Sequence, residues 1–158
     1  MSKLFFIYVH CKIHMKVLTN EDVHTFQPDK FKDSVVLFTM TGCPYCEIMK
    51  PQWDRALKER KNVNALEINA MAYGKIKSLY PKFFEKMTVN GFPTVFAKSG
   101  NSTISFEMPR TTENFVNFFD KHVRKTGGKT IYGTYQRGPK KGKLKKGFKF
   151  IGGVATRV

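Results

Sequence analysis

The feature that most constrains the fold is an apolar run followed closely by a pair of cysteines. Val35 to Phe38 contains no polar residue, which is typical of a strand buried on both faces in a parallel sheet. Cys43-Pro44-Tyr45-Cys46 comes directly after this strand. Apolar residues then recur at helical spacing, at Ile48, Met49, Trp53, Ala56 and Leu57. The pattern predicts that the Cys-x-x-Cys motif opens a helix at the end of a central strand.

Strand and helix patterns alternate along the chain in the order β-α-β-α-β-α-β-β-α. Leu4–Val9 is an apolar run of strand length, and Thr19–Asp22 is a helix-start signal. Pro81 is predicted to split one helical stripe, and Thr111 or Thr112 to cap the last helix. The other predicted strands are Lys16–Leu18, Ser34–Thr39, Val63–Ile68, Thr94–Ala97 and Thr103–Phe106. This order predicts an α/β fold, a central mixed β-sheet with helices on both faces.

The position of the Cys-x-x-Cys motif favours thiol chemistry. A thiolate at a helix N-terminus lies near the positive end of the helix dipole, which lowers its pKa. We therefore predict that Cys43, partly exposed at the helix start, attacks a disulfide, and that the more buried Cys46 resolves the mixed disulfide. Pro44 fits a first helical turn, where its missing N–H is not needed. The competing interpretations are a composite zinc site with Cys11 and a nearby His, and two structural cysteines. We predict no metal and no cofactor.

A second motif, Val89-Asn90-Gly91-Phe92-Pro93-Thr94, leads into a predicted strand. Together with the cysteine motif, the strand Val35–Phe38, the segment Val17-Leu18-Thr19 and Pro51, it resembles the thioredoxin superfamily, in particular thioredoxins and the catalytic domains of protein disulfide isomerases. The resemblance covers about residues 15–125 and implies a thioredoxin-like fold. It also implies that a cis-proline loop lies beside Cys43. The substrate-binding residues implied in this way are Pro44, Tyr45, Phe92 and Pro93.

The chain departs from the family pattern at informative positions. The dipeptide Pro44-Tyr45 between the cysteines is the one typical of glutaredoxins. Gly42 stands where thioredoxins usually carry Trp. Leu37 stands where they carry a buried acid that helps proton transfer to the resolving cysteine. The stretch from Asn69 to Pro93 is longer than in a minimal thioredoxin, which predicts an inserted or extended helix within Tyr73–Met87.

Positive charge is concentrated at the C-terminal end. The chain has 28 Lys and Arg against 12 Asp and Glu, a formal net charge of +16. All 12 acids precede residue 121, whereas residues 121–158 carry 12 Lys and Arg. This predicts an N-terminal extension over 1–14 with a possible extra strand, a thioredoxin-like domain over 15–125, and a basic extended C-terminal arm over 126–158. The arm is suited to an acidic partner, nucleic acid or neighbouring subunits, and its predicted contact residues are Lys140, Lys141, Lys143, Lys145, Lys146 and Lys149.

We therefore predict a thiol–disulfide oxidoreductase that acts on protein disulfides through Cys43 and Cys46. Two other functions stay open: a structural component of a large assembly such as a virus capsid, anchored by the basic tail, and a nucleic-acid-associated redox factor. No apolar run reaches the roughly 18 residues of a membrane span. The apolar run near the N-terminus is shorter than the roughly 7–15 residues of a secretory signal. The predicted compartment is cytoplasmic or, alternatively, a virion or another large particle.

Overall fold

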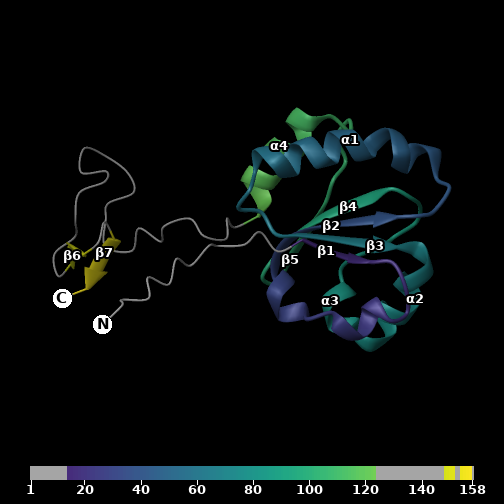
Figure 1. The fold of residues 1–158 in the computed structure, drawn as a ribbon, viewed down its shortest axis with the longest axis horizontal. Helices are drawn as coiled ribbons and strands as arrows, with labels where there is room; N and C mark the ends of the chain where they lie inside the picture. Colours follow the sequence, from purple (N-terminus) through teal and green to yellow (C-terminus); the bar gives the residue numbers. More distant parts are fainter. Residues whose placement is uncertain (1–13, 124–147, 152–153, 158) are drawn as a thin grey trace, which may run out of the picture. The chain divides into compact units, whose positions relative to one another are not determined.

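The computed structural model describes residues 14–123, 148–151 and 154–157 (Figure 1). The chain divides into two compact units, residues 1–126 and 127–158. In the second unit, β6 (Phe148–Ile151) pairs antiparallel with β7 (Val154–Arg157). The predicted strand Leu4–Val9 and most of the predicted arm lie outside the described residues. The three-part division of the chain stays a prediction.

The first unit is built on a five-stranded sheet in the order β1-β3-β2-β4-β5. β1 (His14–Val17) and β2 (Asp33–Thr39) run parallel to β3 (Ala65–Asn69), one on each side of it. β4 (Thr94–Ser99) is antiparallel to β2, and β5 (Ser102–Ser105) is antiparallel to β4. The predicted mixed sheet is therefore confirmed.

β2 is the central strand, and its burial explains its unbroken apolar sequence. Every residue of β2 except the first is buried. Because successive side chains point to opposite faces of a sheet, the run supplies two cores at once. Val35 and Leu37 join the core on one face, while Val36 and Phe38 join the core on the other.

α1 (Pro44–Glu59) and α4 (Thr112–His122) cover one face of the sheet (Figure 1). Trp53 of α1 is fully buried and packs edge-on against Phe115 and Phe119 of α4, with ring centroids 5.5 and 5.4 Å apart. The three rings fix the two helices against each other, so Trp53 is a core residue of α1.

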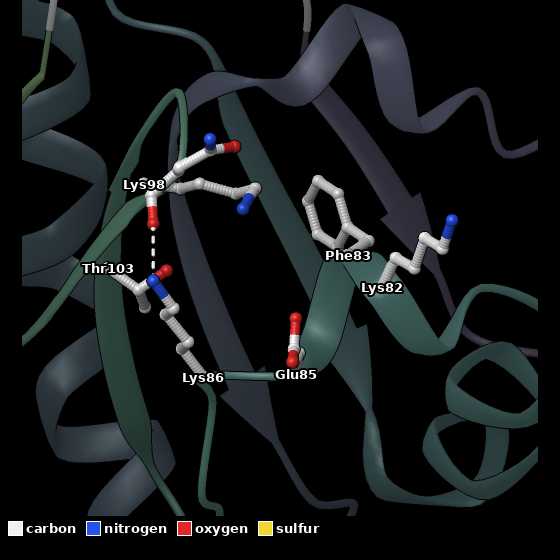
Figure 2. A pocket seen from close by; sticks show the side chains of 7 residues that line it. Lys82, Phe83, Glu85, Lys86, Lys98 and Thr103 are labelled. Atoms are coloured by element: carbon white, nitrogen blue, oxygen red, sulfur yellow. Dashed lines mark hydrogen bonds between the residues drawn. The ribbon is translucent and has the colours of Figure 1, made fainter.

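The opposite face carries two short 3-10 helices, η1 (Asp22–Thr25) and η2 (Pro28–Phe31), and two α-helices, α2 (Ala70–Leu79) and α3 (Pro81–Phe84). α3 begins at Pro81, so this proline does split the helical stripe as predicted. On this face Phe83 of α3 lies beside Lys98 of β4 (Figure 2).

Two helix-start signals have different outcomes. Thr111 caps α4 by accepting a hydrogen bond from the backbone N–H of Asn114 at 3.3 Å. The signal at Thr19–Asp22 opens only the short η1, because Pro28 soon starts a separate turn. None of the helices in the described residues is long and apolar enough to cross a membrane.

Candidate active site

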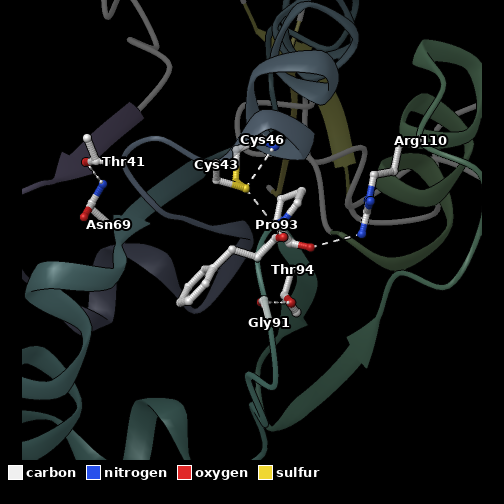
Figure 3. Close-up of a disulfide and its surroundings, with 9 residues drawn as sticks. Thr41, Cys43, Cys46, Asn69, Gly91, Pro93, Thr94 and Arg110 are labelled. Carbon is white, nitrogen blue, oxygen red and sulfur yellow. Dashed lines mark hydrogen bonds between the residues drawn. A yellow bond between two sulfur atoms is a disulfide. The ribbon is translucent and has the colours of Figure 1, made fainter.

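The turn between β2 and α1 is shaped by one glycine and one asparagine. Gly42 has φ +74°, in the left-handed region that favours glycine, so a Trp at this position would be strained. The glycine that replaces the family's Trp is therefore suited to the turn as this chain forms it. Asn69, at the end of β3, donates a hydrogen bond from Nδ2 to Oγ1 of Thr41 at 3.1 Å and accepts one from the N–H of Met71 at 3.0 Å (Figure 3). The turn is therefore tied to the neighbouring strand.

The two cysteines of the motif are joined in a disulfide at the start of α1 (Figure 3). Cys43 is the N-cap residue, and its Sγ accepts a hydrogen bond from the backbone N–H of Cys46 at 3.2 Å. The same sulfur lies 3.6 Å from the carbonyl oxygen of Phe92. Cys43 therefore sits where the unpaired N–H groups of a 16-residue helix point.

The two cysteines are almost equally buried. The exposed fraction is 4% for Cys43 and 6% for Cys46. The prediction that Cys43 is the more exposed of the two is therefore wrong for this disulfide form. The reason is that Cys43 is covered on one side by Cys46 and on the other by the loop that carries Phe92.

The loop before β4 forms the other wall of the site. The Phe92–Pro93 peptide bond is cis, as the resemblance implied. The first residue of β4, Thr94, pairs with Phe38 near the end of β2, which brings the loop beside the cysteine motif. Thr94 Oγ1 also donates a hydrogen bond to the carbonyl of Gly91 at 2.7 Å. The predicted cis-proline loop is therefore confirmed in place.

Arg110 is a residue of the site that the sequence did not reveal. Its Nη2 donates a hydrogen bond to the carbonyl oxygen of Pro93 at 3.2 Å (Figure 3). Arg110 lies between β5 and α4 and belongs to no periodic pattern, so only the fold brings it to this loop. Its guanidinium braces the cis-proline loop through this hydrogen bond.

A groove with both polar and apolar lining lies next to the cysteine motif, and its lining includes Tyr45 of the motif, Glu107 and Arg110. Its volume is about 370 Å³, and it lies between the start of α1 and the segment that joins β5 to α4. Tyr45, Ile48 and Met108 line it with 69%, 73% and 42% of their surfaces exposed. Ile48 belongs to the helical stripe in the sequence, yet it faces the groove instead of the core. Of the other predicted substrate-binding residues, Pro44 is exposed, Phe92 is half-buried and Pro93 is buried.

Leu37 stands where thioredoxins carry a buried acid, and a buried carboxylate lies next to it. Leu37 is fully buried and pairs in register with Glu67 of β3. Glu67 accepts a hydrogen bond from Nζ of Lys50 at 3.0 Å, and Lys50 also donates to Asp54 at 2.8 Å. Lys50 follows Cys46 by one turn of α1. The carboxylate of Glu67 is thus paired with the ammonium of Lys50.

Other predicted sites are covered by the structure only in part. Among the residues that the structure describes, no three His, Cys, Asp or Glu gather to hold a metal ion. Cys11 lies outside the described residues, so the composite zinc site is untested. Of the six tail lysines, Lys149 lies in β6. The other five lie outside the described residues, and their partner stays a prediction.

Comparison with known proteins places this geometry in context. The thioredoxin family model matches residues 14–121. Protein disulfide-isomerase of Drosophila melanogaster is 27% identical over 82% of this chain, and Bloodstream-specific protein 2 of Trypanosoma brucei brucei is 33% identical over 58% of it. The chain spans only 26% and 18% of these two relatives. Their names give no support to the assembly or nucleic-acid alternatives.

Solved structures show a similar fold. The first thioredoxin domain of mouse protein disulfide-isomerase A4 has a TM-score of 0.51 at 18% identity, covering 77% of this chain and 86% of that domain. The J-Trx1 fragment of ERdj5 has a TM-score of 0.50 at 20% identity, covering 70% of this chain and 52% of the fragment. At these identities the likeness concerns the fold alone.

Proposed function

Because the chain belongs to the thioredoxin family, we propose that it is a thiol–disulfide oxidoreductase that acts on protein disulfides through Cys43 and Cys46. The observation that carries the proposal is the hydrogen bond from the N–H of Cys46 to Sγ of Cys43 at the start of α1. In the dithiol form, this N–H and the helix dipole favour the thiolate of Cys43. A thiolate is the species that attacks a disulfide.

The reaction follows as two exchanges. The Cys43 thiolate attacks one sulfur of a substrate disulfide, an S–S bond forms between them, and the other substrate sulfur leaves as a thiolate. The Cys46 thiol gives up its proton and attacks Sγ of Cys43, which releases the second substrate sulfur and closes the Cys43–Cys46 disulfide. Two electrons pass from the protein to the substrate. The reverse sequence oxidises a substrate dithiol, and the reduction potential decides the direction.

The test is a redox titration of the full chain in glutathione buffers of graded potential, read by alkylation and mass spectrometry. The proposal expects one reversible two-electron transition in Cys43 and Cys46. It also expects that Cys43 is alkylated first near neutral pH. A pair that stays dithiol or disulfide across the whole series would overturn the proposal.

Three single substitutions separate the roles of the thiols. Cys43→Ser is expected to abolish reduction of a disulfide-linked polypeptide. Cys46→Ser is expected to stop turnover but to accumulate a mixed disulfide with the substrate on Cys43. Cys11→Ser removes the third thiol and serves as the matched control, with activity unchanged. Full activity in Cys43→Ser contradicts the assignment of the nucleophile.

We also infer that the groove next to the cysteine motif receives the substrate chain. Tyr45 and Ile48 present exposed apolar surface in it, and Arg110, which also lines it, holds the cis-proline loop. This favours polypeptides with a bulky apolar residue beside the reacting cysteine. Ile48→Asp is expected to raise KM for such a peptide about tenfold and to leave reduction of bis(2-hydroxyethyl) disulfide unchanged.

Leu79→Asp is the matched control for the groove, since Leu79 is 49% exposed at the end of α2 and lines no part of the groove. An equal rise of KM in both variants would show that added charge, and not the groove, causes the effect. An unchanged KM in Ile48→Asp would contradict the role of the groove.

A further inference from the structure

A second hollow lies on the face of the sheet opposite α1, and three of its seven lining residues are lysines. It occupies about 370 Å³ between α3 and the turn that joins β4 to β5 (Figure 2). Lys82 and Phe83 of α3, Lys86 just after it, and Lys98 of β4 form its walls. Lys98 follows Thr94 by four residues along β4. At about 3.3 Å per residue, the hollow is therefore roughly 13 Å along the strand from the cis-proline loop.

Lys98 is the unusual residue of this hollow because most of its side chain is buried and its ammonium meets no carboxylate of the described residues. Only 9% of its surface is exposed, and its Nζ lies 5.1 Å from the centre of the Phe83 ring. Within the part of the chain that the structure describes, no carboxylate lies within ion-pair distance of this ammonium. Burial, and then the charge of Lys86, hold the pKa of Lys98 below its ordinary value. A buried ammonium without a counter-charge costs free energy, which the ring offsets only in part.

The charged side chains around Lys98 give the hollow a net positive charge. Lys86 is fixed in place, since its Nζ donates a hydrogen bond to the carbonyl oxygen of Asn101 at 3.1 Å (Figure 2). Glu85 is the one acid in this lining, against the three lysines 82, 86 and 98. At the adjoining rim, Asp29 pairs with Lys32 at 2.9 Å, so these two charges cancel.

We propose that this hollow is a binding site for a multiply charged oxyanion, namely a phosphate group, free or carried by a small organic molecule. The buried ammonium of Lys98 supplies the central charge, and Lys82 and Lys86 supply two more at the rim. Lysine is a common phosphate ligand that acts as a compact point charge, and three such charges in one hollow suit an oxyanion with more than one negative charge. The Phe83 ring gives the organic part of such a molecule an apolar wall.

The test is an NMR titration of the full chain with sodium pyrophosphate, repeated with phenyl phosphate, and with sodium chloride at matched ionic strength. The lysine side-chain methylene and backbone amide resonances at positions 82, 86 and 98 are followed. Saturable shifts at these positions with either phosphate, and none with chloride, are expected. Tighter binding of phenyl phosphate identifies an organic phosphate, and tighter binding of pyrophosphate identifies a free one. Shifts that chloride reproduces overturn the proposal.

Variants separate this site from the other lysines of the chain. Lys98→Met keeps an unbranched side chain against Phe83 but removes the charge. It is expected to weaken phosphate binding about tenfold, the effect of losing one charge-assisted hydrogen bond. Lys86→Met, at an exposed position, is expected to weaken binding several-fold even if Lys98→Met folds poorly. Lys75→Met, on the exposed side of α2, makes the same change of net charge and should leave the affinity unchanged. Equal losses in Lys86→Met and Lys75→Met would overturn the site.

Discussion

Two lysines reach into the molecule on opposite faces of the sheet, and they meet different surroundings. Lys50 of α1 lies 2.8 Å from a carboxylate oxygen of Asp54 and 3.0 Å from one of Glu67. Lys98 of β4 lies over the ring of Phe83 and has, within the described part of the chain, no carboxylate at ion-pair distance.

The two lysines respond to burial in opposite ways. Burial lowers the pKa of Lys50, but its hydrogen bonds to Asp54 and Glu67 outweigh that effect and hold the pKa above its ordinary value. Burial lowers the pKa of Lys98, and the nearby charge of Lys86 lowers it further. The chain thus supplies the counter-charges of the first lysine itself. The second has a counter-charge only if one comes from outside, which is why we assign it to a ligand.

The largest expected effect is the loss of the lysine that has partners. Among the described residues, Lys50→Met leaves the buried Glu67 with Lys16 and His14 as its remaining cationic neighbours, at 3.8 and 3.9 Å. Losing one partner of a buried ion pair is strongly destabilising, and we expect the free energy of unfolding to fall by about 2 kcal/mol. Urea unfolding measures this. The double variant Lys50→Met/Glu67→Gln should recover part of the loss, and a single variant as stable as the wild type would contradict the role of the pair.

The second prediction has the opposite sign. Lys98→Met removes a buried charge without a partner and keeps the contact with Phe83, so the free energy of unfolding should rise by about 1 kcal/mol in phosphate-free buffer. Urea unfolding of Lys75→Met, an exposed lysine, gives the baseline. If Lys98→Met destabilises the protein as Lys50→Met does, the two lysines play the same structural role and the comparison fails.

The third prediction concerns the pH dependence of stability, which is expected to differ between the two lysine variants. In the unfolded chain both lysines titrate near 10.5. Lys98 loses its proton earlier in the folded state, so the unfolded state binds more protons and wild-type stability rises with pH up to that value. The advantage of Lys98→Met should therefore shrink as the pH rises toward 10.5. Lys50 keeps its proton beyond 10.5 in the folded state, so the deficit of Lys50→Met should stay constant over this range. Urea unfolding at each pH measures both differences.

The sequence predicts the backbone of this molecule better than its buried charges. Strand β2, the cysteine motif at the start of α1 and the cis-proline loop follow from apolar runs, helix signals and the family pattern. Glu67 lies between Leu66 and Ile68 in one short strand, and Lys98 lies between Ala97 and Ser99 in another. Nothing in the local sequence indicates whether either charge meets a partner. The partner of Glu67 is Lys50, which comes from helix α1. The ring that meets Lys98 is Phe83, which comes from helix α3. The burial of Cys43 escaped prediction for the same reason, because the loop that covers it lies 49 residues away.

The contact of Arg110 with Pro93 and the exposure of Ile48 are tertiary effects of the same kind. Ile48 is apolar, as core residues usually are, and it lies beside core residues in the sequence. Ile48 precedes Met49 by one residue and therefore lies beside the buried stripe of α1, not in it. Met49 is 2% exposed, whereas Ile48 is 73% exposed. Helical periodicity identifies the stripe, but the packing of α4 decides which edge of it stays open.

The smallest expected effect concerns the rim of the lysine hollow. Asp29 and Lys32 form an exposed pair, with 88% and 63% of their side-chain surfaces accessible, so the pair adds little to stability. Asp29→Asn should leave urea unfolding unchanged. The same substitution removes a negative charge beside the hollow and frees Lys32, so pyrophosphate should bind about twofold more tightly. Glu113→Gln, at the start of α4, changes the net charge equally and is the control. If both variants tighten binding alike, the gain reflects net charge and not the rim. If only Asp29→Asn tightens binding, the bound phosphate supplies Lys98 with the counter-charge that Asp54 and Glu67 supply to Lys50.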